Sequence, residues 1–209
     1  YRHQVTVAVG DQLEGQELQP KVYMVRTKCY VPHNAFINRW NGKPNRAKMI
    51  NYLTNNRDRN VMILRLLIDA TKAGRKILLL TERVDHAKFL KESFDLSMEG
   101  KGVSSMIYIG ETTKEERLLA RDVDVIFATS QMAKEGLDIP TLDTLFLVTP
   151  SSSVITIQQS TGRILRISPG KKDPLVVDFY DENTICVNSA RRRKAIYDQL
   201  NYEVRVVEG

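Results

Sequence analysis

The residues best suited to chemistry lie in Ser151–Ile167, which reads SSSVITIQQSTGRILRI. The spacing predicts a helix capped by Ser153, on which Gln159, Arg163 and Arg166 share a face directed away from the core. Guanidinium groups present planar forks of donors that match phosphate oxygens, so two arginines on one face form a phosphate clamp. A solvated basic face is the alternative interpretation of the same spacing.

Gly162 falls inside this predicted helix, where glycine costs about 1 kcal/mol relative to alanine. Its presence indicates that another group approaches the backbone there. The opposite side of the helix is expected to pack on the core through Val154, Ile157, Thr161, Ile164 and Leu165.

A second polar segment is Val125–Pro140, VIFATSQMAKEGLDIP. A buried strand ends just before Thr129 and Ser130, at the sheet edge where parallel α/β folds gather ligands and helix-start N–H groups hold anions. Gly136–Pro140 is predicted as a tight loop whose only acid, Asp138, is free to accept from a sugar hydroxyl. Alternatively, Thr129 is a helix cap and Asp138 stabilises a turn.

Positive charge is in excess along the chain, because 31 Lys and Arg face 25 Asp and Glu, a surplus of 6 that favours polyanionic partners. The densest positive run, Arg191–Lys194, either contacts a phosphodiester backbone or forms a solvated helix face that pairs with Asp198. Trp40 and Tyr30 either stack on bases or pack beside a connector.

Length and composition exclude several classes of protein. A chain of 209 residues with 42% hydrophobic residues holds one substantial domain, or one domain with an appendage. Two cysteines, Cys29 and Cys186, and three scattered histidines exclude a metal cluster and fit an intracellular protein. No apolar run approaches the ~18 residues that span a bilayer, so membrane and secretory classes are excluded.

From Gly74 onward, the elements that must position these residues repeat one order, or rhythm, of sequence patterns: an apolar run, a turn and an amphipathic helical pattern. This rhythm predicts an α/β domain, a parallel sheet of about five to seven strands with helices on both faces. The predicted strands are Lys76–Leu80, Val103–Ile109, Val123–Ala128, Thr144–Val148 and Pro174–Phe179, with a short run at Val204–Val207. Helical spacing covers Val61–Ile68, Val84–Phe94 and Ala190–Leu200, and a capping box of Thr113 and Glu116 opens another helix.

The first forty residues lack this rhythm. Pro20–Arg26 is predicted as an isolated strand and Asn38–Asn45 as a loop. We therefore divide the chain into a connector from an upstream domain, residues 1–44, and one α/β domain, residues 45–209.

Together these segments resemble superfamily 2 helicases. Motif VI, QxxGRxxR, is matched by Gln159, Gly162, Arg163 and Arg166, and motif V by Ala128, Thr129, Gly136, Asp138 and Pro140. KILLLTERVDHAKFL resembles motif IV, and YIGETTKEER resembles the strand and helix between motifs IV and V. PLVVDFYDEN and SARRRKAIYDQL look most like XPB-like and UvsW-like helicases, including those of large DNA viruses. The resemblance covers residues 45–209 and implies the second RecA-like domain, the helicase C-terminal domain.

The resemblance implies a role for each motif residue in ATP hydrolysis. Arg163 and Arg166 would act as arginine fingers on the γ-phosphate of ATP held between two RecA-like domains, and Gln159 would position the attacking water or the fingers. Asp138 would accept from the ribose. Room for the nucleotide would come from the glycines Gly136 and Gly162.

The resemblance also implies a nucleic-acid partner. Thr129 and Thr81 would contact the phosphates of a bound strand, single or duplex, without reading sequence. The subfamily resemblance favours DNA over RNA.

The chain lacks a GxxxxGK[ST] phosphate loop, which the GKPN of Gly42–Asn45 does not supply. Asp181–Thr184 (DENT) only superficially resembles an acidic metal box, because it follows motif VI. We therefore expect an upstream RecA-like domain to hold Mg²⁺ and the triphosphate, and these 209 residues alone to hydrolyse little or no ATP. The rival interpretations are a non-catalytic RecA-like binding or scaffolding module and a free-standing nucleotide-binding enzyme.

Overall fold

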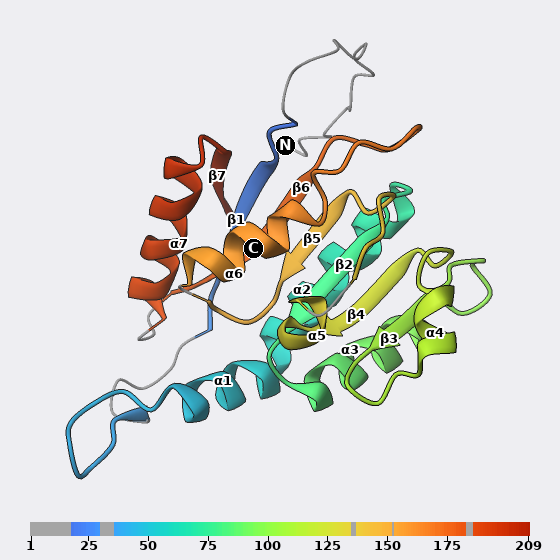
Figure 1. The fold of residues 1–209 in the computed structure, drawn as a ribbon. Helices are drawn as coiled ribbons and strands as arrows, with labels where there is room; N and C mark the ends of the chain where they lie inside the picture. The colour runs from blue at the N-terminus through green and yellow to red at the C-terminus, as the bar shows by residue number, and fades with distance from the viewer. Residues whose placement is uncertain (1–17, 30–35, 135–136, 152, 183–185) are drawn as a thin grey trace.

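A computed structural model describes residues 18–29, 36–134, 137–151, 153–182 and 186–209. Within these ranges the centre is a seven-stranded sheet in the order β3-β4-β2-β5-β6-β1-β7, in which every neighbouring pair runs parallel (Figure 1). The strands are β1 (Lys21–Thr27), β2 (Ile77–Thr81), β3 (Ser105–Tyr108), β4 (Val125–Thr129), β5 (Thr144–Leu147), β6 (Leu175–Asp181) and β7 (Glu203–Glu208). The predicted parallel sheet is confirmed, and the predicted strands end within two residues of the observed ones.

One strand prediction is wrong, because β1 is not isolated. It pairs with β6 on one side and β7 on the other, with Lys21 opposite both Leu175 and Glu203. Val22 and Met24 are fully buried in the core. Local sequence pattern does not report the partners of a strand, and these partners lie about 150 and 180 residues further along the chain.

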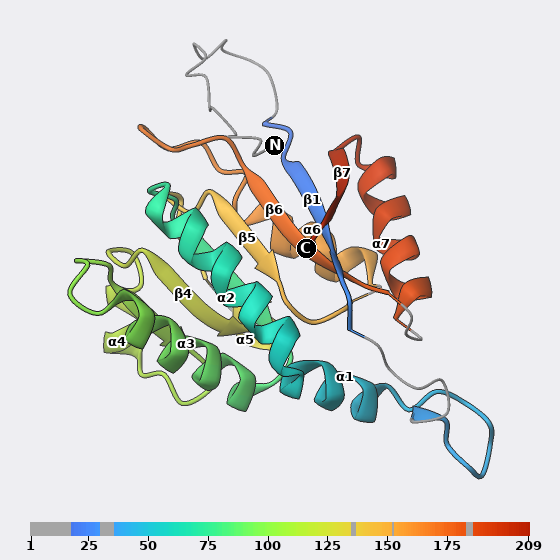
Figure 2. The same ribbon diagram turned by 180° about the vertical axis from the view of Figure 1, so that it is seen from behind.

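Helices cover both faces of the sheet. They are α1 (Arg46–Asn55), α2 (Arg57–Lys72), α3 (Val84–Met98), α4 (Lys114–Leu119), α5 (Ser130–Lys134), α6 (Val154–Gly162) and α7 (Val187–Gln199). Figure 1 views the face with α6 and α7, and Figure 2 the face with α2 and α3. The predicted capping box is present, because Thr113 and Glu116 each accept from the other's backbone N–H. Within the described ranges, no helix is both long and apolar enough to cross a membrane.

Alternate residues of the central strands enter two separate cores. Leu78 and Leu80 pack with α5, α6 and α7, whereas Ile77 and Leu79 pack with α2 and α3. Because both faces of β2 are buried, the strand needs apolar residues at every position and not at alternate ones. This is the physical reason for the continuous apolar runs in the sequence.

The basic run Arg191–Lys194 divides between the interior and the surface. Arg193 is 1% exposed, and its Nε donates to Asp178 Oδ2 at 2.7 Å while its Nη2 donates to the Phe179 carbonyl at 2.9 Å. The predicted surface pair is confirmed for Lys194, whose Nζ lies 2.8 Å from Asp198 Oδ2. The interpretation of the whole run as a solvated face is wrong for Arg193, because position 193 faces the sheet.

A second buried pair occupies the start of the DENT segment. The Asp181 carboxylate accepts from Arg59 Nε at 2.6 Å and from Thr27 Oγ1 at 2.8 Å, and all three residues are buried. Asp181 therefore tethers the amino end of α2 to the ends of β1 and β6. This contact gives the carboxylate a structural role.

Arg193→Ala should lower the free energy of unfolding by about 3–5 kcal/mol, because it leaves the buried Asp178 carboxylate without its cation. The exposed neighbour is the matched control, and Arg192→Ala should change stability by about 0.5 kcal/mol or less. Urea unfolding followed by circular dichroism measures both. Equal stability of the two variants would contradict the buried placement of Arg193.

Candidate functional site

The sheet order brings two distant segments together. β5 and β6 are neighbours, with Thr144 opposite Leu175, and the Leu175 N–H donates to the Asp143 carbonyl at 2.9 Å. The segments that lead into these strands, residues 137–143 and 163–174, must therefore converge at the same end of the sheet. Asp138 of the predicted nucleotide site lies in the first segment, and Arg163 and Arg166 lie in the second.

The 137–142 turn is fixed by its apolar side chains. Leu137, Ile139 and Leu142 are buried beneath α5 and α6, whereas Asp138 between them is exposed. Alternate burial holds the backbone against the core and directs the carboxylate outward. Asp138 is therefore exposed at the surface, while Gly136 lies outside the described residues.

Helix α6 is shorter than predicted. Ser153 caps it as expected, accepting from the Thr156 N–H at 3.3 Å, but the helix ends at Gly162 and not at Ile167. The N–H groups of Arg163 and Ile164 donate to carbonyls three residues earlier, which tightens the last turn. The prediction that Arg166 lies on this helix is wrong, since the chain has already left it.

Both arginines nevertheless contact the 137–142 turn. Arg163 Nη1 donates to the Leu137 carbonyl at 2.5 Å, and the Arg166 guanidinium pairs with the Asp138 carboxylate. The side chains of Arg166 and Asp138 are 46% and 54% exposed. An exposed ion pair contributes about 0–1 kcal/mol, so an incoming anion can displace the carboxylate at little cost.

Lys171 is a third cation at this turn, which the sequence does not single out. Its Nζ donates to the Pro140 carbonyl at 3.1 Å and to the Arg166 carbonyl at 2.6 Å. Partial burial lowers the pKa of Lys171; Asp143 opposes this shift and Arg166 adds to it. The site therefore holds three cations around one exposed carboxylate, an arrangement that attracts anions.

Two further motif VI residues lie on α6. Gln159 is exposed on α6, four residues before Arg163. A Cβ built on Gly162 meets no atom within 4 Å, so no packing within the described residues requires glycine there. The close approach predicted at Gly162 stays a prediction about a ligand.

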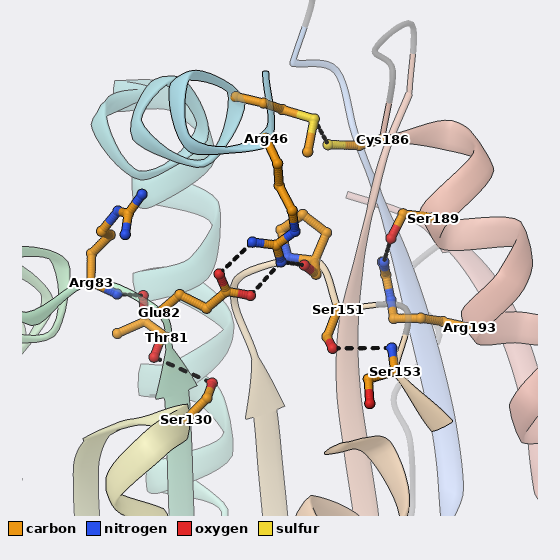
Figure 3. A network of polar contacts seen from close by, with 12 residues as sticks. Arg46, Thr81, Glu82, Arg83, Ser130, Ser151, Ser153, Cys186, Ser189 and Arg193 are labelled. Carbon is orange, nitrogen blue, oxygen red and sulfur yellow. Dashed lines mark hydrogen bonds and ion pairs between the residues drawn. The ribbon is translucent and has the colours of Figure 1, made fainter. Parts of the chain in front are cut away.

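The two residues predicted to contact a nucleic-acid strand lie at the opposite end of the sheet. Thr81 and Thr129 are the last residues of β2 and β4 and stand opposite each other in register. Thr129 is largely buried and Thr81 completely so. The Thr81 carbonyl accepts from Ser130 Oγ at 3.3 Å, as Figure 3 shows.

The hydroxyl of Thr81 is hydrogen-bonded to a buried histidine. Thr81 Oγ1 lies 3.0 Å from His86 Nδ1, and His86 Nε2 lies 3.0 Å from Asn60 Oδ1. Asn60 Nδ2 donates to the Thr54 carbonyl at 2.8 Å, so Asn60 Oδ1 accepts from Nε2–H and Nδ1 accepts from Thr81. Burial, with a smaller contribution from Arg59, lowers the pKa of His86 from 6.5 to about 3. His86 is therefore neutral at pH 7.

Arg46 on α1 braces this same edge. Its guanidinium donates to both Glu82 carboxylate oxygens, at 2.6 and 2.5 Å, and to the Pro150 carbonyl at 2.8 Å. Figure 3 shows Arg46 reaching from α1 to Glu82. The contacts join the chain just after β2 to the chain just after β5. The sequence offers no signal for this brace, because α1 was not predicted as a helix.

Comparison with known proteins identifies the family. Residues 58–168 match the family model described as "Helicase conserved C-terminal domain". The chain belongs to this family. The matched helicase domain includes Thr81, Thr129 and Asp138 together with Gln159, Arg163 and Arg166, and so contains both ends of the sheet described above.

Two viral relatives show the same relationship. A protein of Acanthamoeba polyphaga mimivirus, named as an ATP-dependent RNA helicase, is 32% identical over 171 residues, 81% of this chain and 32% of its own length. A protein of Escherichia phage T5, named as helicase D10, is 28% identical over 130 residues, 59% of this chain and 28% of its own length. This helicase domain therefore spans less than a third of each relative.

Solved helicase structures have the same fold. T4 UvsW superposes with a TM-score of 0.66 at 20% identity, covering 92% of this chain and 42% of UvsW. The C-terminal domain of the DEAD-box protein Dbp5 gives a TM-score of 0.58 at 16% identity, covering 92% of this chain and 91% of that domain. The predicted RecA-like fold of a superfamily 2 helicase C-terminal domain is confirmed.

The buried His86 predicts a pH dependence of stability. Its pKa is lower in the folded helicase domain than in the unfolded chain, so the unfolded state binds more protons and stability falls as the pH drops below 6.5. Between pH 7 and 5 this one group should remove about 2 kcal/mol of stability.

His86→Gln removes the titrating group, so the variant should lose about 2 kcal/mol less than the wild type over this pH interval. Urea unfolding at both pH values measures the difference, in which groups common to both proteins cancel. The same pH dependence in both proteins would show that His86 is not buried in the neutral form.

Proposed function

We propose that this chain is the second motor domain of an ATP-dependent superfamily 2 helicase or translocase. In this role it supplies arginine fingers to a nucleotide held against an upstream RecA-like domain. The observation that carries the proposal is the meeting of Arg163 and Arg166 with the Leu137–Asp138 turn. These residues come from motifs V and VI, and they are in contact although 26 and 28 positions separate the two pairs in sequence.

The donor set suits the phosphates of ATP. Arg163, Arg166 and Lys171 surround the turn, and Arg166 and Asp138 are about half exposed. Arg166 would exchange Asp138 for phosphate oxygens, and Asp138 would then be free to accept from a ribose hydroxyl. Bound ATP would supply the phosphoanhydride bond that is hydrolysed. Two guanidinium groups stabilise the charge that develops on phosphate, an effect of about 10³–10⁵ in rate in related chemistry.

The same residues do not suit Mg²⁺. Asp138 is the one carboxylate exposed at the turn, and Arg166 neutralises it. Among the residues that the structure describes, no group of three or more His, Cys, Asp or Glu side chains converges on a point. We therefore assign Mg²⁺ and the phosphate cradle to an upstream domain.

Thr129 would contact the phosphates of the bound nucleic-acid strand at the carboxyl end of β4. Thr81 at the end of β2 is completely buried and its hydroxyl is bonded to His86, so it would support this contact and not make it. Such contacts do not read bases. We propose DNA as the substrate, on the resemblance to UvsW-like helicases. The mimivirus relative is named as an RNA helicase, so a test must compare both nucleic acids.

In this mechanism the domain acts by closing on its partner. Closure would bring Arg163 and Arg166 to the nucleotide while Thr129 holds the nucleic-acid strand, and reopening would release one of these two contacts. The sites lie at opposite ends of the same rigid sheet. A tilt of this domain would therefore move both sites at once.

The alternative is a non-catalytic binding or scaffolding module. The observation that opposes it is the exposed, exchangeable pair of Arg166 and Asp138. A scaffold needs neither the exposed cation nor the exposed acid, whereas a finger and a ribose acceptor must both be accessible. An independent nucleotide-binding enzyme is opposed by the absence of a phosphate loop in the sequence.

Arg163→Ala and Arg166→Ala should each lower the kcat of nucleic-acid-stimulated ATP hydrolysis by about 10³-fold or more in the longer protein that contains this domain. The exposed Arg191→Ala is the control for charge removal and should leave kcat unchanged. Steady-state ATPase assays with single-stranded DNA and with RNA of the same length measure both the loss and the preferred strand.

The same assay on the 209 residues alone should show little or no turnover, because the triphosphate cradle is absent from this sequence. Turnover by the longer protein that survives either arginine change would remove the finger role from that residue. Rapid turnover by the 209 residues would refute the division of labour between two domains.

A further inference from the structure

Trp40 is 97% exposed, although it is a large apolar side chain and the one tryptophan in the sequence. The sequence leaves two interpretations of Trp40 open, base stacking and packing beside a connector. The structure removes the second for the described residues, since the ring packs against none of them. An indole ring exposed to this extent offers its aromatic face to a partner.

The loop that carries Trp40 is well defined. Ile37 and Pro44 form an antiparallel bridge at its base, and the Asn45 N–H donates to the Phe36 carbonyl at 2.6 Å. At the tip, the Trp40 N–H donates to Asn38 Oδ1 at 3.0 Å. Gly42 allows the turn with φ +63°, a left-handed conformation that glycine adopts readily. These bonds hold the indole ring away from the body of the domain.

Exposed cations lie on the loop that carries Trp40 and on the first turn of α1. The sequence contains no Asp or Glu from Cys29 to Arg57. Arg39, Lys43 and Lys48 are exposed, and no carboxylate among the described residues pairs with any of them. The combination of an exposed aromatic ring and unpaired cations matches a base and its phosphates.

The loop is attached to the edge of the sheet where contacts with a nucleic-acid strand are proposed. It leads into α1, and Arg46 at the start of α1 is bonded to Glu82 and Pro150, just beyond β2 and β5. Figures 1 and 2 both show α1 crossing this end of the sheet, with the loop extending beyond it. A strand that lies across Thr81 and Thr129 can therefore continue toward Trp40.

We propose that Trp40 is a stacking platform for a base of a single-stranded nucleic acid, whose phosphates pair with Arg39, Lys43 and Lys48. This inference rests on the proposed function, because it assumes a bound strand. The contact lies outside residues 58–168, the part that matches the helicase family model. It adds a contact with a base to a domain whose other proposed contacts with the nucleic acid are to phosphates only.

The sole tryptophan makes the contact directly measurable in the 209-residue chain. Intrinsic fluorescence is followed while a fluorescein-labelled oligothymidylate of about 12 nucleotides, within the range of known single-strand sites, is titrated. An abasic oligomer with the same number of phosphates is the matched probe. Fluorescence anisotropy of the label reports binding independently, and Trp40→Ala and Trp40→Phe are compared with the wild type.

Stacking predicts that oligothymidylate quenches Trp40 and that the abasic oligomer does not. Trp40→Ala should bind oligothymidylate about tenfold more weakly, whereas Trp40→Phe, which keeps an aromatic face, should bind within about threefold of the wild type. The abasic oligomer should bind Trp40→Ala and the wild type equally.

Three outcomes would overturn the proposal. Binding by anisotropy without quenching, and with unchanged affinity of Trp40→Ala, removes the stacking role and leaves the proposed nucleic-acid function in place. If neither oligomer binds, both the stacking role and the proposed nucleic-acid function are removed. If Trp40→Ala instead lowers the melting temperature of the longer protein and leaves its oligonucleotide affinity unchanged, the ring is covered by protein.

Discussion

Parallel pairing of all seven described strands is the constraint that decides where each functional group of this chain lies. Every strand ends at the same edge, so Thr81 and Thr129 become neighbours although 48 residues separate them. Each connection must return to the opposite edge, and the adjacent strands β5 and β6 draw the 137–143 and 163–174 segments together. The parallel arrangement thus separates the candidate contacts with nucleic acid from the arginine cluster and places both on the same rigid sheet.

Burial decides what each arginine can do. Arg59 and Arg193 are paired with carboxylates inside the protein, where losing a partner costs several kcal/mol, so they serve the fold. Arg166 makes the same type of pair with Asp138 at the surface, where water screens it and exchange is cheap. The same chemical interaction is a permanent tether in one place and an exchangeable contact in the other. This difference is the physical basis for assigning Arg166, and not Arg193, to a ligand.

Much of the fold was predictable because both faces of the sheet are covered, which makes strands such as β2 continuously apolar, and because Thr113 and Ser153 are strong helix caps. The candidate residues of the nucleotide site were also indicated, since motifs V and VI share one family pattern. Other features depend on tertiary structure and leave no local signal: the place of β1 in the sheet and the inward direction of Arg193. The role of Lys171 follows from the convergence of two segments, which no spacing reports.

The central claim is that the cluster on the Leu137–Asp138 turn forms one wall of a nucleotide site. Its most direct test is a structure of the longer protein with a non-hydrolysable ATP analogue and a bound strand. We expect the guanidinium groups of Arg163 and Arg166 within about 3 Å of terminal phosphate oxygens, with Asp138 released from Arg166. If the analogue is bound while Arg163 stays on the Leu137 carbonyl and Arg166 on Asp138, the claim is contradicted.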